Sequence, residues 1–179
     1  MDYESTHSDI VRQCQDGNRQ AQFELYRLYS RAMYNVCLRI VKHDGNAEDM
    51  LQRSFTDVFM KIHTFRFESS VGAWIKRITV NNCINFLKKR RLEIEELNDR
   101  YHHIPEDNNP TGDCALNIEK VNKALLQLPD GYRVVFSLYL LEGYDHKEIG
   151  QILNISEATS KSQYSRAKAK MRTLLQDVI

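Results

Sequence analysis

The chain has 179 residues, and its 25 Lys and Arg side chains almost balance 24 Asp and Glu side chains, for a formal net charge of +1. It holds no run of about 18 consecutive apolar residues, and its polar start lacks the pattern of a secretory signal, so we expect a cytoplasmic protein without a membrane span. With only 7 Gly and 3 Pro residues, the composition excludes collagen-like and loop-dominated architectures and favours long helices.

The near-zero net charge conceals blocks of opposite sign. Residues 69–92 carry 6 basic and no acidic residues, whereas residues 93–114 carry 7 acidic residues and 1 basic residue. Residues 156–173 carry 5 basic residues and 1 acidic residue. Two basic segments separated by an acidic one indicate a polyanionic partner, although each basic run alone could be a solvated helix face.

Apolar residues recur at helical spacing in the N-terminal half and predict three helices. Asn18 is expected to cap a helix that runs to about Lys42. We expect Gly45 to end that helix and Asn46 to cap the next. A further helix is predicted over residues 71–91.

The helical pattern weakens after Leu92 and resumes near residue 117. Residues 93–116 therefore form a predicted acidic linker, which separates helical domains over residues 1–92 and 117–179. Because no strand-like alternation is present, the predicted fold class is all-α. The helices expected in the second domain cover residues 117–128, 130–142, 145–153 and the segment that follows Ser156.

The last two of these helices match a DNA-binding helix-turn-helix. Asp145 opens a short helix with a capping box, and a tight turn from Asn154 to Ser156 leads into a longer basic helix. One side of the basic helix carries small residues between two rows of cations, which suits a major groove. A solvated amphipathic helix is the alternative. Ser160 falls on the apolar side, where the sequence does not explain it. The candidates for contacts at or near the bases are Thr159, Lys161, Ser162 and Arg166.

The other basic helix has different chemistry. Cations and amides share one face of it, with an aromatic residue at the border: Arg77, Asn81, Asn85 and Lys88, beside Trp74. Aromatic stacking, amide hydrogen bonds and cations together favour single-stranded or melted nucleic acid. Trp74 could equally be a core residue, and the amides, with Asn82 among them, could simply face water.

Three stretches of the chain are similar to conserved parts of one family. Residues 46–59 are similar to a polymerase-binding helix, residues 68–91 to a minus-10 helix, and residues 128–172 to a minus-35 domain. In this order and spacing, the chain resembles the bacterial RNA polymerase sigma factors of the sigma-70 family, in the compact extracytoplasmic-function group.

The resemblance implies a sigma factor that binds RNA polymerase core enzyme and directs promoter-specific transcription initiation, with an anti-sigma factor as a further partner. It implies no catalytic residue and no cofactor. The residues implied to bind the clamp helices of the largest polymerase subunit are Asp49, Gln52 and Phe55. Those implied to engage minus-10 promoter DNA are Trp74, Arg77, Asn81, Asn82, Asn85 and Lys88. Those implied to bind the minus-35 duplex are Thr159, Lys161, Ser162, Arg166 and Lys168.

Two alternatives remain open at the level of sequence. A stand-alone helix-turn-helix regulator would bind duplex DNA stably without polymerase. An enzyme with a metal site near His102 and His103 is disfavoured, because these residues fall in the predicted linker without ligand periodicity. The sequence also contains no Gly-rich phosphate loop, and its four cysteines form no C-x-x-C pair.

Overall fold

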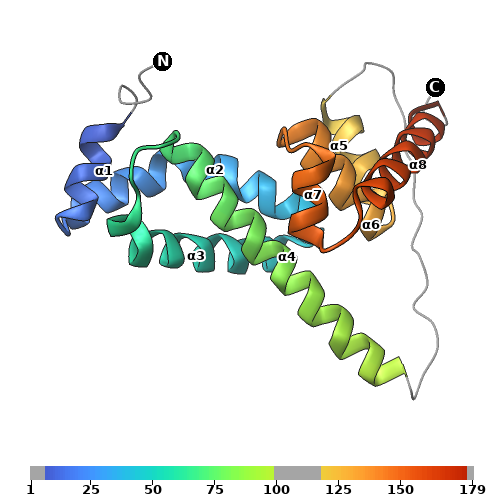
Figure 1. Ribbon diagram of the computed structural model, residues 1–179, viewed down its shortest axis with the longest axis horizontal. Helices are drawn as coiled ribbons and strands as arrows, with labels where there is room; N and C mark the ends of the chain where they lie inside the picture. Colours follow the sequence, from blue (N-terminus) through green and yellow to red (C-terminus); the bar gives the residue numbers. More distant parts are fainter. Residues whose placement is uncertain (1–6, 99–117, 177–179) are drawn as a thin grey trace. The chain divides into compact units, whose positions relative to one another are not determined.

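The computed structural model describes residues 7–98 and 118–176, and within these ranges every regular element is a helix (Figure 1). The all-α prediction is therefore confirmed. The chain divides into two compact units, residues 1–85 and 86–179, and the division falls inside helix α4. Within the described ranges, no helix combines the length and the apolar character that a membrane crossing requires.

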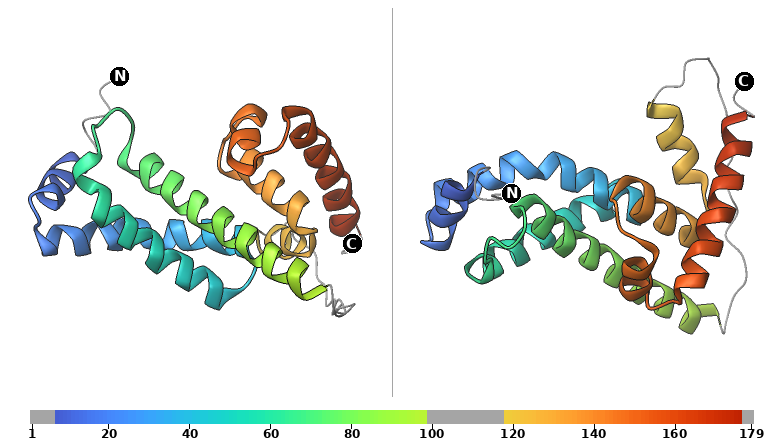
Figure 2. Two further views of the ribbon diagram at one scale, coloured as in Figure 1. Left: turned by 60° about the horizontal axis from the view of Figure 1, so that its bottom comes forward. Right: turned by 45° about the horizontal axis from the view of Figure 1, so that its top comes forward.

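The N-terminal unit is a helical bundle. Helices α2 and α3 pack side by side, and α1 packs against α2 (Figure 2). Fully buried side chains from three helices, such as Leu25, Val58 and Ile75, form its core. Its elements are α1 (Ser8–Gln15), α2 (Arg19–Val41), α3 (Asp44–Lys61), the short 3-10 helix η2 (Ile62–Thr64) and the first half of α4 (Val71–Asn98).

The start of α2 agrees with the prediction, but the turn into α3 does not. The Asn18 side chain accepts hydrogen bonds from the backbone N–H groups of Gln20, at 2.9 Å, and Ala21, at 3.2 Å. The predictions for Gly45 and Asn46 are wrong, because both lie inside the first turn of α3. Lys42, with φ of 74°, takes the left-handed conformation that we expected of a glycine.

Helix α4 also continues further than the sequence indicated. It runs to Asn98, so the predicted end of this helix at residue 91 is wrong. Residues 92–98 contain Leu, Ile and Glu and no Gly or Pro, and these good helix formers extend the last turns. The remainder of the predicted linker, including His102 and His103, lies outside the described residues.

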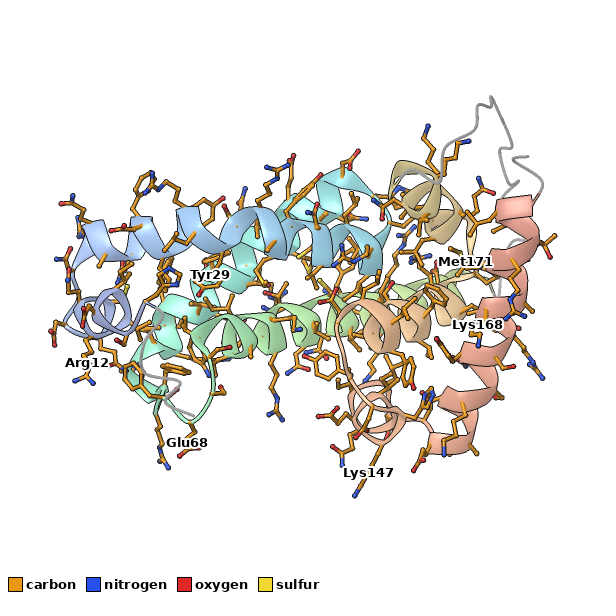
Figure 3. All side chains as sticks on the ribbon, turned by 90° about the horizontal axis from the view of Figure 1, so that it is seen from above. Arg12, Tyr29, Glu68, Lys147, Lys168 and Met171 are labelled. Atoms are coloured by element: carbon orange, nitrogen blue, oxygen red, sulfur yellow. The ribbon has the colours of Figure 1, made fainter. Side chains whose placement is uncertain are left out.

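The C-terminal unit is a second helical group with its own core. Leu125, Leu128, Phe136, Ala167 and Met171 pack together in it. Met171 of α8 is buried, while Lys168, about one turn earlier, is exposed (Figure 3). The elements are α5 (Ile118–Gln127), α6 (Asp130–Phe136), the π-helical segment η3 (Ser137–Leu141), α7 (His146–Leu153) and α8 (Glu157–Gln176).

Candidate nucleic-acid and polymerase interfaces

The turn between α7 and α8 is fixed by local hydrogen bonds. Asp145 and Glu148 form the predicted capping box, with bonds of 2.7 and 2.8 Å between each side chain and the other residue's backbone N–H. Asn154 has φ of 58°, and the N–H of Ile155 donates to the carbonyl of Gly150 at 3.0 Å. A Cβ atom on Gly150 would stand 2.9 Å from the Ile155 carbonyl oxygen. The glycine therefore allows the two helices their close approach.

The outward side of α8 has the predicted arrangement. Its strip of small residues is exposed: Ala158, Ser162, Ser165 and Ala169. The cations on both edges are exposed as well: Lys161, Arg166, Lys168, Lys170 and Arg172. A helix with a small-residue centre can come close to a groove while its cations reach phosphates on either side.

Three of the predicted minus-35 residues already have partners in α8 or in the residue that precedes it. Lys161 forms an exposed ion pair with Glu157, 2.6 Å between Nζ and Oε1, and this pairing raises the pKa of Lys161 and lowers the pKa of Glu157. Thr159 shares a 2.8 Å hydrogen bond with the hydroxyl of Ser156. Ser162 donates to the carbonyl of Thr159 at 2.9 Å. A phosphate contact by Lys161 would therefore require it to leave the Glu157 carboxylate.

The structure explains Ser160 through a residue that the sequence reasoning missed. Ser160 is fully buried, and its hydroxyl lies 2.9 Å from Nδ1 of His146, the first residue of α7. The His146 ring stacks on Tyr139 with centroids 4.3 Å apart, and it meets Tyr164 edge-on at 5.7 Å. A buried hydroxyl with a partner is tolerated in a core. His146 therefore joins the π-helical segment and α7 to α8.

One face of α4 presents the cations and amides predicted from the sequence, since Arg77, Asn81, Asn85 and Lys88 are all exposed. Trp74 is half-buried at the border, with its ring 5.2 Å from that of Phe65.

The aromatic group continues into the loop before α4. Phe67 lies 5.0 Å from Phe65 between ring centroids, and the guanidinium of Arg12 lies 5.3 Å from the centroid of the Phe67 ring. Trp74 thus belongs to a packed aromatic cluster and remains partly exposed.

Asn82 differs from its neighbours on α4. It is half-buried and turns toward α3, where its amide donates to Oδ2 of Asp57 at 2.9 Å. The structure therefore separates Asn82 from the exposed face formed by Arg77, Asn81 and Asn85.

The polymerase-binding prediction is only partly supported by geometry. Asp49 and Gln52 are exposed on α3. Phe55 is only 3% exposed, and its ring packs on that of Tyr26 with centroids 4.8 Å apart. Its placement on an exposed surface is wrong, because position 55 falls on the apolar stripe of the helix. Met60 was missed. It is 68% exposed, and about three helical turns separate it from Asp49 on the same side of α3.

Two family models together cover most of the chain. Residues 25–93 match sigma-70 region 2, and residues 118–171 match sigma-70 region 4. The extracytoplasmic-function sigma factor SigM of Bacillus subtilis is 30% identical over 152 residues, which span 84% of this chain and 93% of that protein. This chain belongs to the extracytoplasmic-function sigma factors of the sigma-70 family. SigW of the same organism is 27% identical to it over 179 residues, which span 94% of this sigma factor and 96% of SigW.

Solved structures share the fold of this sigma factor. RpoE of Bartonella quintana, in complex with the anti-sigma factor NepR, has a TM-score of 0.59 and 22% identity over 86% of this chain and 95% of its own. CnrH, in complex with the cytosolic domain of CnrY, has a TM-score of 0.55 and 20% identity over 94% of this chain and 96% of its own. The region 2 match contains the exposed faces of α3 and α4, and the region 4 match contains α7 and most of α8.

Proposed function

We propose that this sigma factor docks on RNA polymerase core enzyme through the exposed side of α3 and brings two DNA-binding helices to a promoter. The observation that carries the proposal is the exposed face of cations and amides on α4, in the same helical bundle as α3. A stand-alone duplex-binding regulator has no need of such a face, whereas a protein that holds a melted strand does. The polymerase-binding residues are Asp49, Gln52 and Met60.

The two DNA-binding helices have different proposed tasks. Helix α4 engages the minus-10 element as the duplex opens: Arg77 and Lys88 hold the backbone, and Asn81 and Asn85 bond to base edges. The exposed part of the Trp74 ring supports a base at the end of this face.

Helix α8 lies in the major groove of the minus-35 duplex. Its residues close to the bases are Thr159 and Ser162, and its phosphate contacts come from Lys161, Arg166 and Lys168. Because both helices act by binding alone, the chain has no proposed catalytic step and works in the cytoplasm with polymerase.

An anti-sigma factor is the proposed regulatory partner. RpoE and CnrH, which share the fold, were each solved with a bound partner, the anti-sigma factor NepR and the cytosolic domain of CnrY respectively. We extend this mode of control to the present chain, where such a partner would compete for the exposed faces of α3 and α8.

The proposal is tested by equilibrium binding of the labelled full-length protein to purified core enzyme. Two variants alter the α3 surface: Asp49→Lys combined with Gln52→Ala, and Met60→Asp. Asp16→Lys is the charge-matched control, because Asp16 is exposed after α1 and is not part of α3. Tight wild-type binding that both α3 variants lose and the control keeps is the expected result. No binding by the folded wild type, together with stable duplex binding by the protein alone, would favour the regulator instead.

A further inference from the structure

Asn82 makes polar contacts that bridge α4 and α3. Its amide nitrogen lies 2.9 Å from Oδ2 of Asp57 and 3.4 Å from the hydroxyl oxygen of Ser54. Ser54 is fully buried, and its own hydroxyl donates to the carbonyl of Met50 at 2.6 Å. The Asn82 amide of α4 therefore directs its N–H donors to two side chains of α3, those of Asp57 and Ser54.

The bond from Asn82 to Asp57 has the properties of a directional anchor. A hydrogen bond to a carboxylate is stronger than one between neutral groups, and both side chains here are half-buried. Apolar contacts such as those of Ile75 and Val80 resist separation of the helices but tolerate small rotations, since they have no preferred direction. A polar bond of fixed geometry selects one rotation of α4 about its axis.

This rotation matters because Asn81 adjoins Asn82 in sequence and points about 100° away around the helix. When the amide of Asn82 is held on α3, the exposed face of Arg77, Asn81, Asn85 and Lys88 is aimed in one direction. Without that bond, α4 could take other rotations about its axis. It would have to return to the rotation seen here before the four side chains could bind DNA together.

We propose that Asn82 is a positioning residue, which orients the minus-10 face of α4 through its hydrogen bond to Asp57 and does not itself contact DNA. This inference rests on the proposed function of α4. It replaces the direct minus-10 contact predicted for Asn82 from the sequence, and it assigns a role to Asp57, which had none.

A double-mutant cycle tests the inference in the full-length protein bound to core enzyme. The readout is the dissociation constant for the fluorescent non-template strand of a promoter mapped from the transcripts of the wild-type holoenzyme. Asn82→Ala and Asp57→Ala should each weaken binding by about fivefold, and the double variant should be no weaker than either alone. Asp57→Asn, whose side-chain oxygen still accepts the bond, should restore most of the affinity. Affinity for core enzyme, measured in parallel, should stay within about twofold.

Asn81→Ala provides the matched control. Asn81 is exposed on the proposed DNA-facing side of α4. The fold-loss in DNA affinity caused by Asn81→Ala should therefore multiply with the fold-loss caused by Asp57→Ala when the two are combined. Independent effects of Asn82→Ala and Asp57→Ala, or a loss with Asp57→Asn as large as with Asp57→Ala, would overturn the inference while leaving the proposed function intact. A wild-type holoenzyme that starts no specific transcript would overturn the proposed function, and this inference with it.

Discussion

Replacing Gly150 with alanine should loosen the helix-turn-helix, although alanine is the better helix former. The gain in helix propensity is about 1 kcal/mol. Against it, the added Cβ would lie 2.9 Å from the Ile155 carbonyl oxygen, which is a backbone atom and cannot rotate away. The turn must shift, at about 1–3 kcal/mol for overpacking, and the hydrogen bond from the Ile155 N–H to Gly150 is weakened by about 1 kcal/mol more. The net loss is about 1–3 kcal/mol.

Hydrogen exchange in the full-length protein measures this loss at the site. Peptides from α7 and α8 should exchange about 5- to 150-fold faster in Gly150→Ala than in the wild type. Gly45→Ala is the control, because Gly45 lies in the first turn of α3 with nothing within 4 Å of an added Cβ. That variant should slow exchange in α3. If Gly150→Ala protected α7 and α8 as well as the wild type, the close approach inferred for the turn would be refuted.

Three further predictions concern single contacts. Glu157→Gln releases Lys161 from its ion pair, so minus-35 duplex binding at low salt should tighten and its salt slope should steepen by up to about one, as measured by a salt titration. Because Lys161 lowers the pKa of Glu157, this difference should vanish once the pH falls below that lowered pKa and the wild-type carboxyl is neutral. Ser160→Val leaves the ring nitrogen of His146 without this partner and should destabilise the C-terminal unit by about 1 kcal/mol in urea unfolding, whereas an unchanged midpoint would count against the bond. Phe55→Ala should cost about 3 kcal/mol of stability yet leave the core-enzyme affinity of the folded fraction unchanged, and a selective loss of affinity would mean that Phe55 contacts polymerase directly.

Much of the architecture could be predicted because its signals are local. The cap at Asn18, the capping box at Asp145 and the tight turn that begins at Asn154 each depend on residues within one helical turn, and each is present in the structure. The exposed faces of α4 and α8 follow from helical periodicity in the same way. A single sequence is informative where a structural feature and its cause lie a few residues apart.

The sequence is less informative where a distant partner decides the outcome. Asn81 and Asn82 are identical neighbours in the sequence, and only the packing of α3 against α4 brings Asp57 beside Asn82. Ser160 conflicts with its apolar surroundings until His146, from another helix, is placed beside it. Phe55 was predicted from family position to be on the surface, and its contact with Tyr26 of α2 buries it.

The turn between α2 and α3 is a different kind of error. Glycine is the usual residue in a left-handed conformation, so Gly45 was the natural choice for the end of α2. The chain instead places Lys42 there, at an intrinsic cost of about 1–2 kcal/mol. The N–H of Lys42 bonds to the carbonyl of Leu38 at 2.9 Å, and the carbonyl of His43 accepts from Ala47 at 2.9 Å, so both helix ends are satisfied.

The most direct test of the account is whether the protein gives promoter specificity to RNA polymerase. Purified core enzyme would transcribe fragmented bacterial genomic DNA with and without the protein, and the 5′ ends of the transcripts would be sequenced. The account predicts discrete start sites that appear only with the protein and share two upstream sequence elements, and it predicts that an Arg77→Ala, Asn81→Ala variant loses them. Transcripts as dispersed as those of core enzyme alone, made in the presence of folded protein, would contradict it.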